Sequence, residues 1–148
     1  MEDIEDITGV LVTPLEIKDT PSGCVLHGLR DTDVGFLGFG ECYFSTIDQL
    51  LVKGWKRHNK MTLNLIVPHG EILFVLVDDR ESKNAPIVRE ITLSKSNYCR
   101  LTIPPLVWFG FQGLASNNFL MNVANIKHDP HEVDAKTINH FNYIWKKQ

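Results

Sequence analysis

The chain has 148 residues, 43% of them hydrophobic, which is enough for one compact domain with its own core. Its formal net charge of -3 and its pI near 6.0 provide no basic surface for nucleic acid or an anionic membrane. No apolar run approaches the roughly 20 residues of a membrane-spanning helix, which argues against a membrane protein of that kind.

The first residues and the cysteines further restrict the class of protein and its expected compartment. The opening stretch, MEDIEDITG, is acidic, which argues against a secretory signal or a transit peptide. The three cysteines, Cys24, Cys42 and Cys99, are odd in number and lack CxxC spacing, so neither a disulfide framework nor a zinc site is expected. These features predict a single domain over residues 1–148 in the reducing cytoplasm.

Strand patterns cover most of the chain. Pro21 and Gly23 mark residues 17–23 as a turn, and residues 45–51 fit either a loop or one helical turn. Helical character appears only in the tail, over about residues 130–145. Many short strands with closely spaced turns predict an all-β antiparallel sandwich or barrel with a short C-terminal helical segment. The expected strands outside the centre of the chain are residues 7–15, 24–29, 36–44, 87–93, 98–103, 107–114 and 119–125.

Residues 52–80 form the centre around which the other predicted strands are arranged. They read as two strands joined by a hairpin turn at Pro68-His69-Gly70. Because side chains alternate along a strand, the first run predicts an apolar face from Trp55 to Val67. The opposite, polar face contains Lys56, His58, Lys60, Thr62 and Asn64. Residues 72–77 are apolar on both faces, which is typical of a central, doubly covered strand.

Three spaced motifs occur in the same order in one known family. They are GWxxHxxMTLNxxVxxGEIxxVLxDDR from Gly54, NYCRLTIPPxVWxGF from Asn97 and HDPxE from His128. On these residues the chain resembles the short cupin proteins related to dTDP-4-dehydrorhamnose 3,5-epimerase, over roughly residues 39–132. The resemblance implies a cupin-type double-stranded β-helix, or jelly-roll barrel, that forms a homodimer and binds a nucleotide-linked 4-keto sugar. It also implies cofactor-independent proton transfer at carbons next to the ketone, in the synthesis of sugars for polysaccharides such as O-antigen.

The chain departs from this family where the chemistry lies. The short relatives have GWHxH, so Lys56 stands at the position of the catalytic His, and His58 keeps the second His. Phe109 stands where the IPP turn of the larger members continues to His. The strand over residues 119–125 lacks their general-acid Tyr. The segment with the Asp that partners their catalytic His is not expected either, since the sequence stops at Gln148.

The remaining groups suit proton transfer next to a ketone. His58 fits the role of the general base with little tuning by its surroundings. The Lys56 ammonium can hold an enolate oxygen, or Lys56 can act as a base if burial lowers its pKa. The alternative is that both side chains form a solvated strand face. The resemblance favours a cavity-lining position, more strongly for His58.

Six further residues are candidate substrate contacts, each with a structural alternative. Trp108 can stack on a sugar or base, or pack in the core. The amides of Asn64 and Asn122 need either a ligand or a neighbouring backbone group. Residues 128–132 can place a base at the barrel rim or form a solvated turn. The six are Lys53, Thr62, Asn64, Trp108, Asn122 and His128.

Metal and cofactor sites are not expected, because an ammonium at position 56 breaks the HxH pair that a cupin metal site would use. Three functions stay open. The first is a nucleotide-sugar epimerase or isomerase. The second is a catalytically degenerate cupin that binds a nucleotide sugar, and the third is a structural partner in a sugar-modifying assembly. Solvent deuterium exchange at carbons beside the ketone separates the first from the others.

Overall fold

The computed structural model describes residues 2–3 and 6–147, and nearly all of its regular structure is β-strand. None of the described residues forms a helix of the length and hydrophobicity needed to cross a membrane. The elements are β1 (Glu2–Asp3), β2 (Leu11–Pro14), β3 (Ile17–Thr20), β4 (Gly23–Leu26), β5 (Glu41–Asp48), β6 (Val52–His58), β7 (Leu63–His69), β8 (Glu71–Asp78), β9 (Ile87–Ser94), β10 (Cys99–Ile103), β11 (Trp108–Gly113), β12 (Asn117–Ala124), the 3-10 turn η1 (Pro130–Glu132) and β13 (Val133–Ala135).

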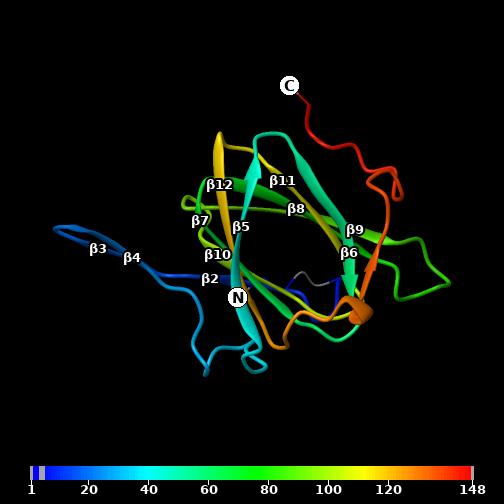
Figure 1. The fold of residues 1–148 in the computed structure, drawn as a ribbon, viewed down its shortest axis with the longest axis horizontal. Coiled ribbons are helices and arrows are strands. Elements are labelled where there is room, and N and C mark those ends of the chain that lie inside the picture. Colours follow the sequence, from blue (N-terminus) through cyan, green and yellow to red (C-terminus); the bar gives the residue numbers. More distant parts are fainter. Residues whose placement is uncertain (1, 4–5, 148) are drawn as a thin grey trace.

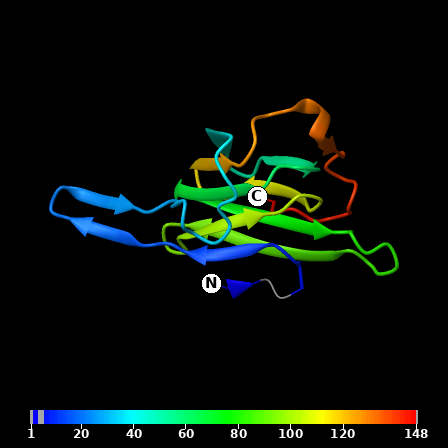
Figure 2. The same cartoon turned by 90° about the horizontal axis from the view of Figure 1, so that it is seen from below.

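Two sheets face each other and form the barrel (Figures 1 and 2). The six-stranded sheet has the order β1-β2-β10-β7-β12-β5, and the five-stranded sheet has the order β13-β6-β11-β8-β9. Each ladder between the described strands is antiparallel, which confirms the predicted all-β class. Strands β3 and β4 form a separate hairpin that projects from the barrel, so residues 17–23 are not the simple turn that the sequence predicts.

The core lies between the two sheets, where the apolar side chains of their inner faces meet. Leu63 and Leu65 of β7 face Phe74 and Leu76 of β8 across this space, and all four are nearly inaccessible to solvent. Strand β8 is paired on both sides and buried through Val77, which confirms the predicted doubly covered strand.

The predicted hairpin at Pro68-His69-Gly70 is wrong. Strand β7 pairs with β10 and β12 in one sheet, whereas β8 pairs with β11 and β9 in the other. The turn therefore carries the chain from one sheet to the other. Gly70 is needed there because its φ is +83° and a Cβ would come within 2.2 Å of the Asn117 carbonyl oxygen.

The predicted helical tail is not confirmed. Only the single 3-10 turn η1 forms, and β13 follows it and pairs with β6. Residues 136–147 then cross the outer face of the five-stranded sheet, with a turn over residues 138–141 (Figure 1). After the turn, Phe141, Tyr143 and Trp145 pack at alternate positions against Trp55.

Candidate active site

A cavity of about 390 Å³ lies between the sheets at one end of the barrel. Its apolar wall comes from inward-facing residues of β7, β11 and β12, and its polar groups come mainly from β5 and β6. The lining residues are Glu41, Tyr43, Ser45, Lys53, Gly54, Lys56, His58, Met61, Leu63, Leu65, Phe109, Phe111, Leu120, Asn122, His128 and Val133.

His58, the last residue of β6, forms a buried pair with Glu132. Its Nδ1 is hydrogen-bonded to Glu132 Oε1, and only 9% of His58 and 3% of Glu132 are exposed. The turn η1 brings Glu132 to this position, since Asp129 caps it and Pro130 supplies the fixed φ of its first residue. Strand β13 then holds the turn against β6 through the Val133–His58 register.

The Glu132 carboxylate is held in its ionised form. Burial alone would raise its pKa, but the bond from His58 and the backbone N–H groups of Lys60 and Met61 lower the pKa below its ordinary value. Oε2 accepts N–H bonds from Asn59 at 3.1 Å, Lys60 at 3.0 Å and Met61 at 3.2 Å. An ionised carboxylate only accepts hydrogen bonds, so His58 donates from Nδ1 and its Nε2 is left as the basic nitrogen.

A β-bulge turns two lysines toward the cavity. In the β6–β11 ladder Lys53 pairs with Phe111 and Lys56 with Phe109, so an extra residue of β6 is accommodated opposite Gly110. Gly54 has a φ of +147°, and a Cβ there would come within 2.7 Å of Gly110 Cα. The bulge lets Lys53 and Lys56, three residues apart, line one cavity, and Lys53 Nζ donates to the Thr46 carbonyl at 2.7 Å.

Tyr43 and Asn122 line the cavity from the six-stranded sheet, where they are directly paired on β5 and β12. Asn122 Nδ2 donates to Tyr43 Oη at 3.0 Å, which leaves the hydroxyl hydrogen of Tyr43 available to a ligand. Asn122 Oδ1 is buried and has no hydrogen-bond partner within the part of the chain that the structure describes. A buried acceptor without a partner is expected to receive a hydrogen bond from a bound molecule or from water.

The structure separates the predicted site residues into two groups. Lys53, Lys56, His58, Asn122 and His128 line the cavity. Thr62, Asn64 and Trp108 do not. The prediction that Thr62 and Asn64 share a face with His58 is wrong, because residues 59–62 leave the ladder and carry the chain to the opposite sheet.

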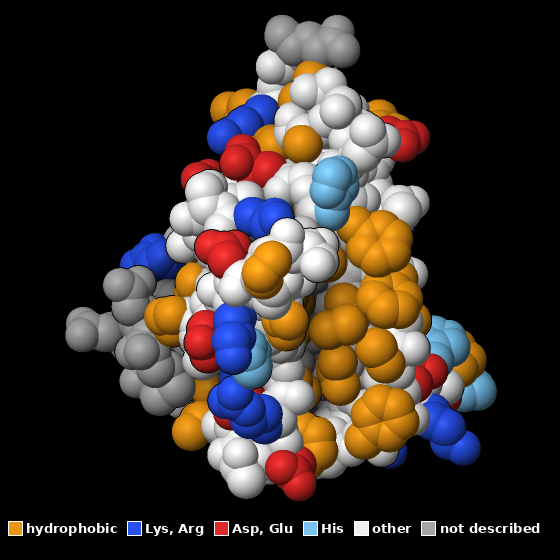
Figure 3. Space-filling model, turned by 90° about the vertical axis from the view of Figure 1, so that its left-hand side faces the viewer, with side chains coloured by type: hydrophobic (Ala, Val, Ile, Leu, Met, Phe, Trp, Pro, Cys, Tyr) orange, Lys and Arg blue, Asp and Glu red, His pale blue; other side chains and the backbone are white. Residues whose placement is uncertain are grey.

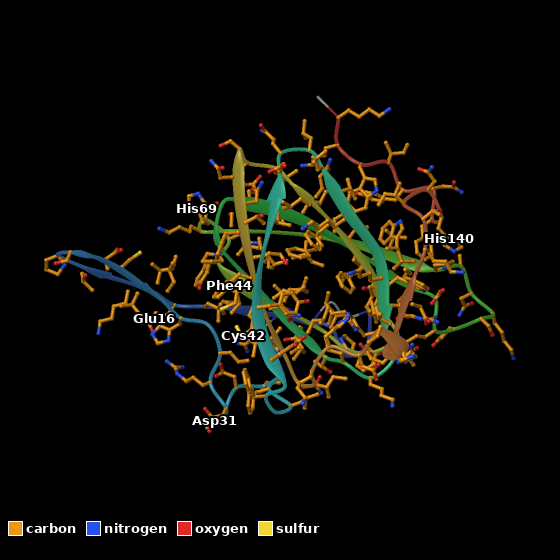
Figure 4. The ribbon with its side chains drawn as sticks, viewed as in Figure 1. Glu16, Asp31, Cys42, Phe44, His69 and His140 are labelled. Carbon is orange, nitrogen blue, oxygen red and sulfur yellow. The ribbon has the colours of Figure 1, made fainter. Side chains whose placement is uncertain are left out.

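The three residues outside the cavity have structural partners. Asn64 lies on the outer face of the six-stranded sheet, where it accepts from Thr102 Oγ1 at 2.7 Å and donates to the Gly35 carbonyl at 3.0 Å. Thr62 is buried beside Asn125, which accepts its backbone N–H. Trp108 packs under the C-terminal tail and donates to Asp79 Oδ2 at 3.2 Å. Arg80 holds the turn after β8 through its ion pair with Asp78, and His69 is exposed (Figure 4).

The sequence assigns no role to Tyr43, and it offers Glu132 only as one member of the run 128–132, not as the partner of His58. Glu132 falls in the HDPxE run, where a solvated turn was one expectation; the Asp-Pro cap that makes such a turn also buries the residue two positions later. Tyr43 lay at the end of an expected strand, but its neighbour Asn122 was assigned without a partner. No group of three or more His, Cys, Asp or Glu side chains within residues 2–3 and 6–147 is arranged to hold a metal ion.

Comparison with solved structures decides the family. A dTDP sugar isomerase from Desulfovibrio desulfuricans is 35% identical, with a TM-score of 0.86 over 90% of this chain and 87% of that one. The chain belongs to the RmlC-like family of dTDP-sugar epimerases and isomerases. No family model matches the sequence, and no curated protein matches it either.

More distant structures show that the RmlC-like fold extends across the chain. The rmlC epimerase from Mycobacterium tuberculosis is 17% identical, with a TM-score of 0.81 over 95% of this chain and 76% of that one. The sugar 3,4-ketoisomerase QdtA from Thermoanaerobacterium thermosaccharolyticum, solved with TDP, is 18% identical, with a TM-score of 0.74 over 91% of this chain and 93% of that one. The predicted cupin-type jelly roll is therefore confirmed.

Proposed function

We propose that this RmlC-like protein epimerises or isomerises a dTDP-linked 4-keto-6-deoxyhexose, with His58 as the base that removes a proton next to the ketone. The observation that carries the proposal is the Glu132–His58 pair on the wall of a cavity of about 390 Å³. A positioned base of this kind supplies a rate factor of about 10²–10⁴.

His58 has the features of such a base. Glu132 fixes its tautomer and ring position, and the ring lies nearly parallel to that of Phe109, 6.1 Å away and tilted by 14°. Once Nε2 takes a proton, the ionised carboxylate stabilises the imidazolium that forms. A paired carboxylate is what distinguishes this arrangement from a histidine on a solvated strand.

The electron pair released from carbon moves to the ketone oxygen, and the enolate needs a positive charge or a donor. Lys56 supplies an ammonium from the same strand as His58, and Tyr43 supplies a phenol O–H from the facing sheet. The open acceptor Asn122 Oδ1 suits a sugar hydroxyl. We assign Tyr43 and Lys56 to the enolate oxygen and Asn122 to substrate binding.

The fate of the proton distinguishes two products. Protonation of the same carbon on its opposite face gives the epimer, and His58 then releases its own proton to solvent. Protonation of the former carbonyl carbon, with the proton of the neighbouring hydroxyl moving to the former ketone oxygen, gives the isomer in which the ketone has moved. Both routes start from the enolate beside His58 and keep atoms and charge balanced. Lys53 and His128 line the same cavity and suit the diphosphate of the nucleotide, a ligand class supported by the TDP found in the QdtA structure.

The test is an NMR experiment in D₂O with a panel of dTDP-4-keto-6-deoxyhexoses. Wild-type protein should incorporate deuterium at a carbon next to the ketone, and His58→Gln should lower the rate by about 10²- to 10⁴-fold. Binding of dTDP, measured by thermal stabilisation, should be preserved. His69→Gln serves as the matched control, because His69 is exposed and lies outside the cavity.

Two results would contradict the proposal. If His58→Gln exchanges the proton at the wild-type rate, His58 is not the base that removes it. Stabilisation by every sugar of the panel without exchange or product would instead identify a module that binds nucleotide sugars.

A further inference from the structure

A second pocket lies on the outer face of the six-stranded sheet, on the side away from the sugar cavity. Its volume is about 170 Å³, and it is bordered by β2, by β10 and by residues 27–33. Leu101 belongs to the core, so its neighbour Arg100 points to the opposite, outer face. Glu16 lies at the edge of this pocket, where the β3–β4 hairpin leaves the barrel (Figure 4).

Arg100 forms the floor of this pocket and is fully buried. Its Nη1 donates to the Gly28 carbonyl at 2.8 Å and to Asp33 Oδ2 at 3.2 Å, and its Nη2 donates to the Val34 carbonyl at 3.2 Å. Its Nε–H is buried and has no partner among residues 2–3 and 6–147. Burial also lowers the pKa of Arg100, and the charge and hydrogen bond of Asp33 offset this effect only in part.

Thr13 presents a second unpartnered polar group beside the first. Its Oγ1 is buried and has no hydrogen-bond partner within the described chain, and Thr13 sits directly opposite Arg100 in the β2–β10 ladder. Side chains at directly paired positions have Cβ atoms about 5 Å apart. Leaving a buried donor without a hydrogen-bond partner is unfavourable, so two such groups at paired positions favour a bound partner.

The rim adds further donors. Arg30 Nη2 donates to His27 Nδ1 at 3.1 Å, and the other ring nitrogen of His27 faces Glu16 at 3.8 Å. Asp33 is already occupied by the Arg30 backbone N–H, which lowers its pKa, and by Arg100. Asp33 therefore has a cationic partner, and Glu16, which is mostly exposed, faces the His27 ring at the edge of the pocket. The Arg100 Nε–H and the Thr13 hydroxyl are open.

We propose that this pocket binds a small oxyanion of the phosphate type, either free or as the terminal phosphoryl group of a small molecule. A tetrahedral oxyanion accepts from an Arg Nε–H and from a hydroxyl, and the Arg30 guanidinium supplies charge at the mouth. A single water can accept from both open groups but does not fill the pocket, which has room for several at about 30 Å³ each.

Calorimetric titration with inorganic phosphate at constant ionic strength tests this site, with the protein first saturated with TDP to occupy the sugar cavity. The expected result is saturable binding with a dissociation constant of about 1 mM or below. Thr13→Val should weaken it at least about fivefold, since the change removes one hydroxyl and keeps the shape. Thr46→Val is the matched control, because Thr46 is an exposed threonine of β5, at the far edge of the same sheet.

Two further arms complete the experiment. Arg30→Gln should also weaken phosphate binding, whereas Lys53→Gln, which alters the sugar cavity, should leave it unchanged. Methyl phosphate in place of phosphate distinguishes a phosphoryl group from the free ion. Absence of saturable binding to the wild type, or an equal affinity in Thr13→Val, would overturn the proposal without touching the catalytic one.

Discussion

Glu132 positions the base in the proposed mechanism. It accepts four hydrogen bonds while almost fully buried, and three of its donors are successive backbone N–H groups in the segment that follows β6. The sequence provides the two partners 74 positions apart, His58 with an expected role and Glu132 without one. Only the return of the chain through η1 and β13 brings them together.

Glu132→Gln tests that pairing through pH. Because the folded-state pKa is below the ordinary value near 4.5, the ionised carboxylate stabilises the fold above pH 4.5, and this contribution is lost as pH falls through the lowered pKa. The variant should therefore be less stable than wild type by about 1–3 kcal/mol at pH 7, with the gap closing in acid. Urea unfolding across pH measures it. A gap that stays constant down to strongly acidic pH would contradict the assignment.

Lys56 allows a sharper test of what replaced the family's histidine. If the Lys56 ammonium holds the enolate, Lys56→His should lower proton exchange, since a neutral imidazole carries no charge at pH 7. If position 56 has only to present a basic nitrogen, the same variant should keep or raise the rate. Exchange rates from NMR, compared with Lys53→Gln on the same strand, distinguish the two roles.

Tyr43 could not be assigned from the sequence because its importance comes from a pairing. Its strand was expected to end at residue 44, whereas β5 continues to Asp48 and lies beside β12. Tyr43→Phe removes one oxygen and should lower turnover by about 10²- to 10⁴-fold if the phenol serves the enolate. Affinity for dTDP should be preserved. If Tyr43→Phe has a turnover number close to that of the wild type, the phenol does not stabilise the enolate, and Lys56 is the group that does.

At the scale of elements, local patterns predicted strands better than they predicted sheets. Residues 87–93 and 98–103 were expected as strands and occur as β9 and β10 within one residue at each end. The alternation of residues 55–67 was misread as one strand, because a sequence pattern does not reveal that residues 59–62 cross between sheets. The same crossing explains why Leu63 faces the cavity although Asn64 was expected there.

The sequence predicts a broken helical segment in the C-terminal tail, over about residues 130–145, and the structure does not confirm it. The start of the tail is held beside β6 instead, because the pairing of β13 with β6 continues in the backbone bonds between Trp55 and Lys136, and a turn over residues 138–141 follows. Trp55 Nε1 also donates to the Ile138 carbonyl at 3.0 Å, and Gln112 Nε2 donates to the Lys146 carbonyl at 2.9 Å. The tail thus supports the outer side of the strand that carries His58.

Trp145→Ala tests that support. Trp145 packs on Trp55 with ring centroids 5.4 Å apart, and its loss should destabilise the protein by about 1–3 kcal/mol. Proton exchange should fall as well, because β6 is held less firmly behind His58. Ile144→Ala is the neighbouring control, since Ile144 is 83% exposed and should change the free energy of unfolding by no more than about 0.5 kcal/mol. Thermal unfolding with equal effects of both changes would contradict this role.

At the scale of the whole molecule, one face of the barrel remains apolar and uncovered (Figure 3). Phe44 and Phe119 stack on the outer face of the six-stranded sheet with ring centroids 5.3 Å apart, and they are 59% and 37% exposed. Strand β5, which carries Phe44, forms an edge of that sheet. Natural sheets rarely leave an apolar edge strand open to water, since it invites pairing with another chain.

We propose that a second copy of the chain covers this face, as the family resemblance implies. Wild-type protein should sediment as a dimer at micromolar concentration, and Phe44→Asp should shift it to monomer, because a carboxylate would have to be buried without a partner. Val88→Asp is the control: Val88 is 40% exposed on β9, the edge strand of the other sheet. A wild-type monomer would exclude the dimer, and a Phe44→Asp dimer of unchanged affinity would move the interface to another face.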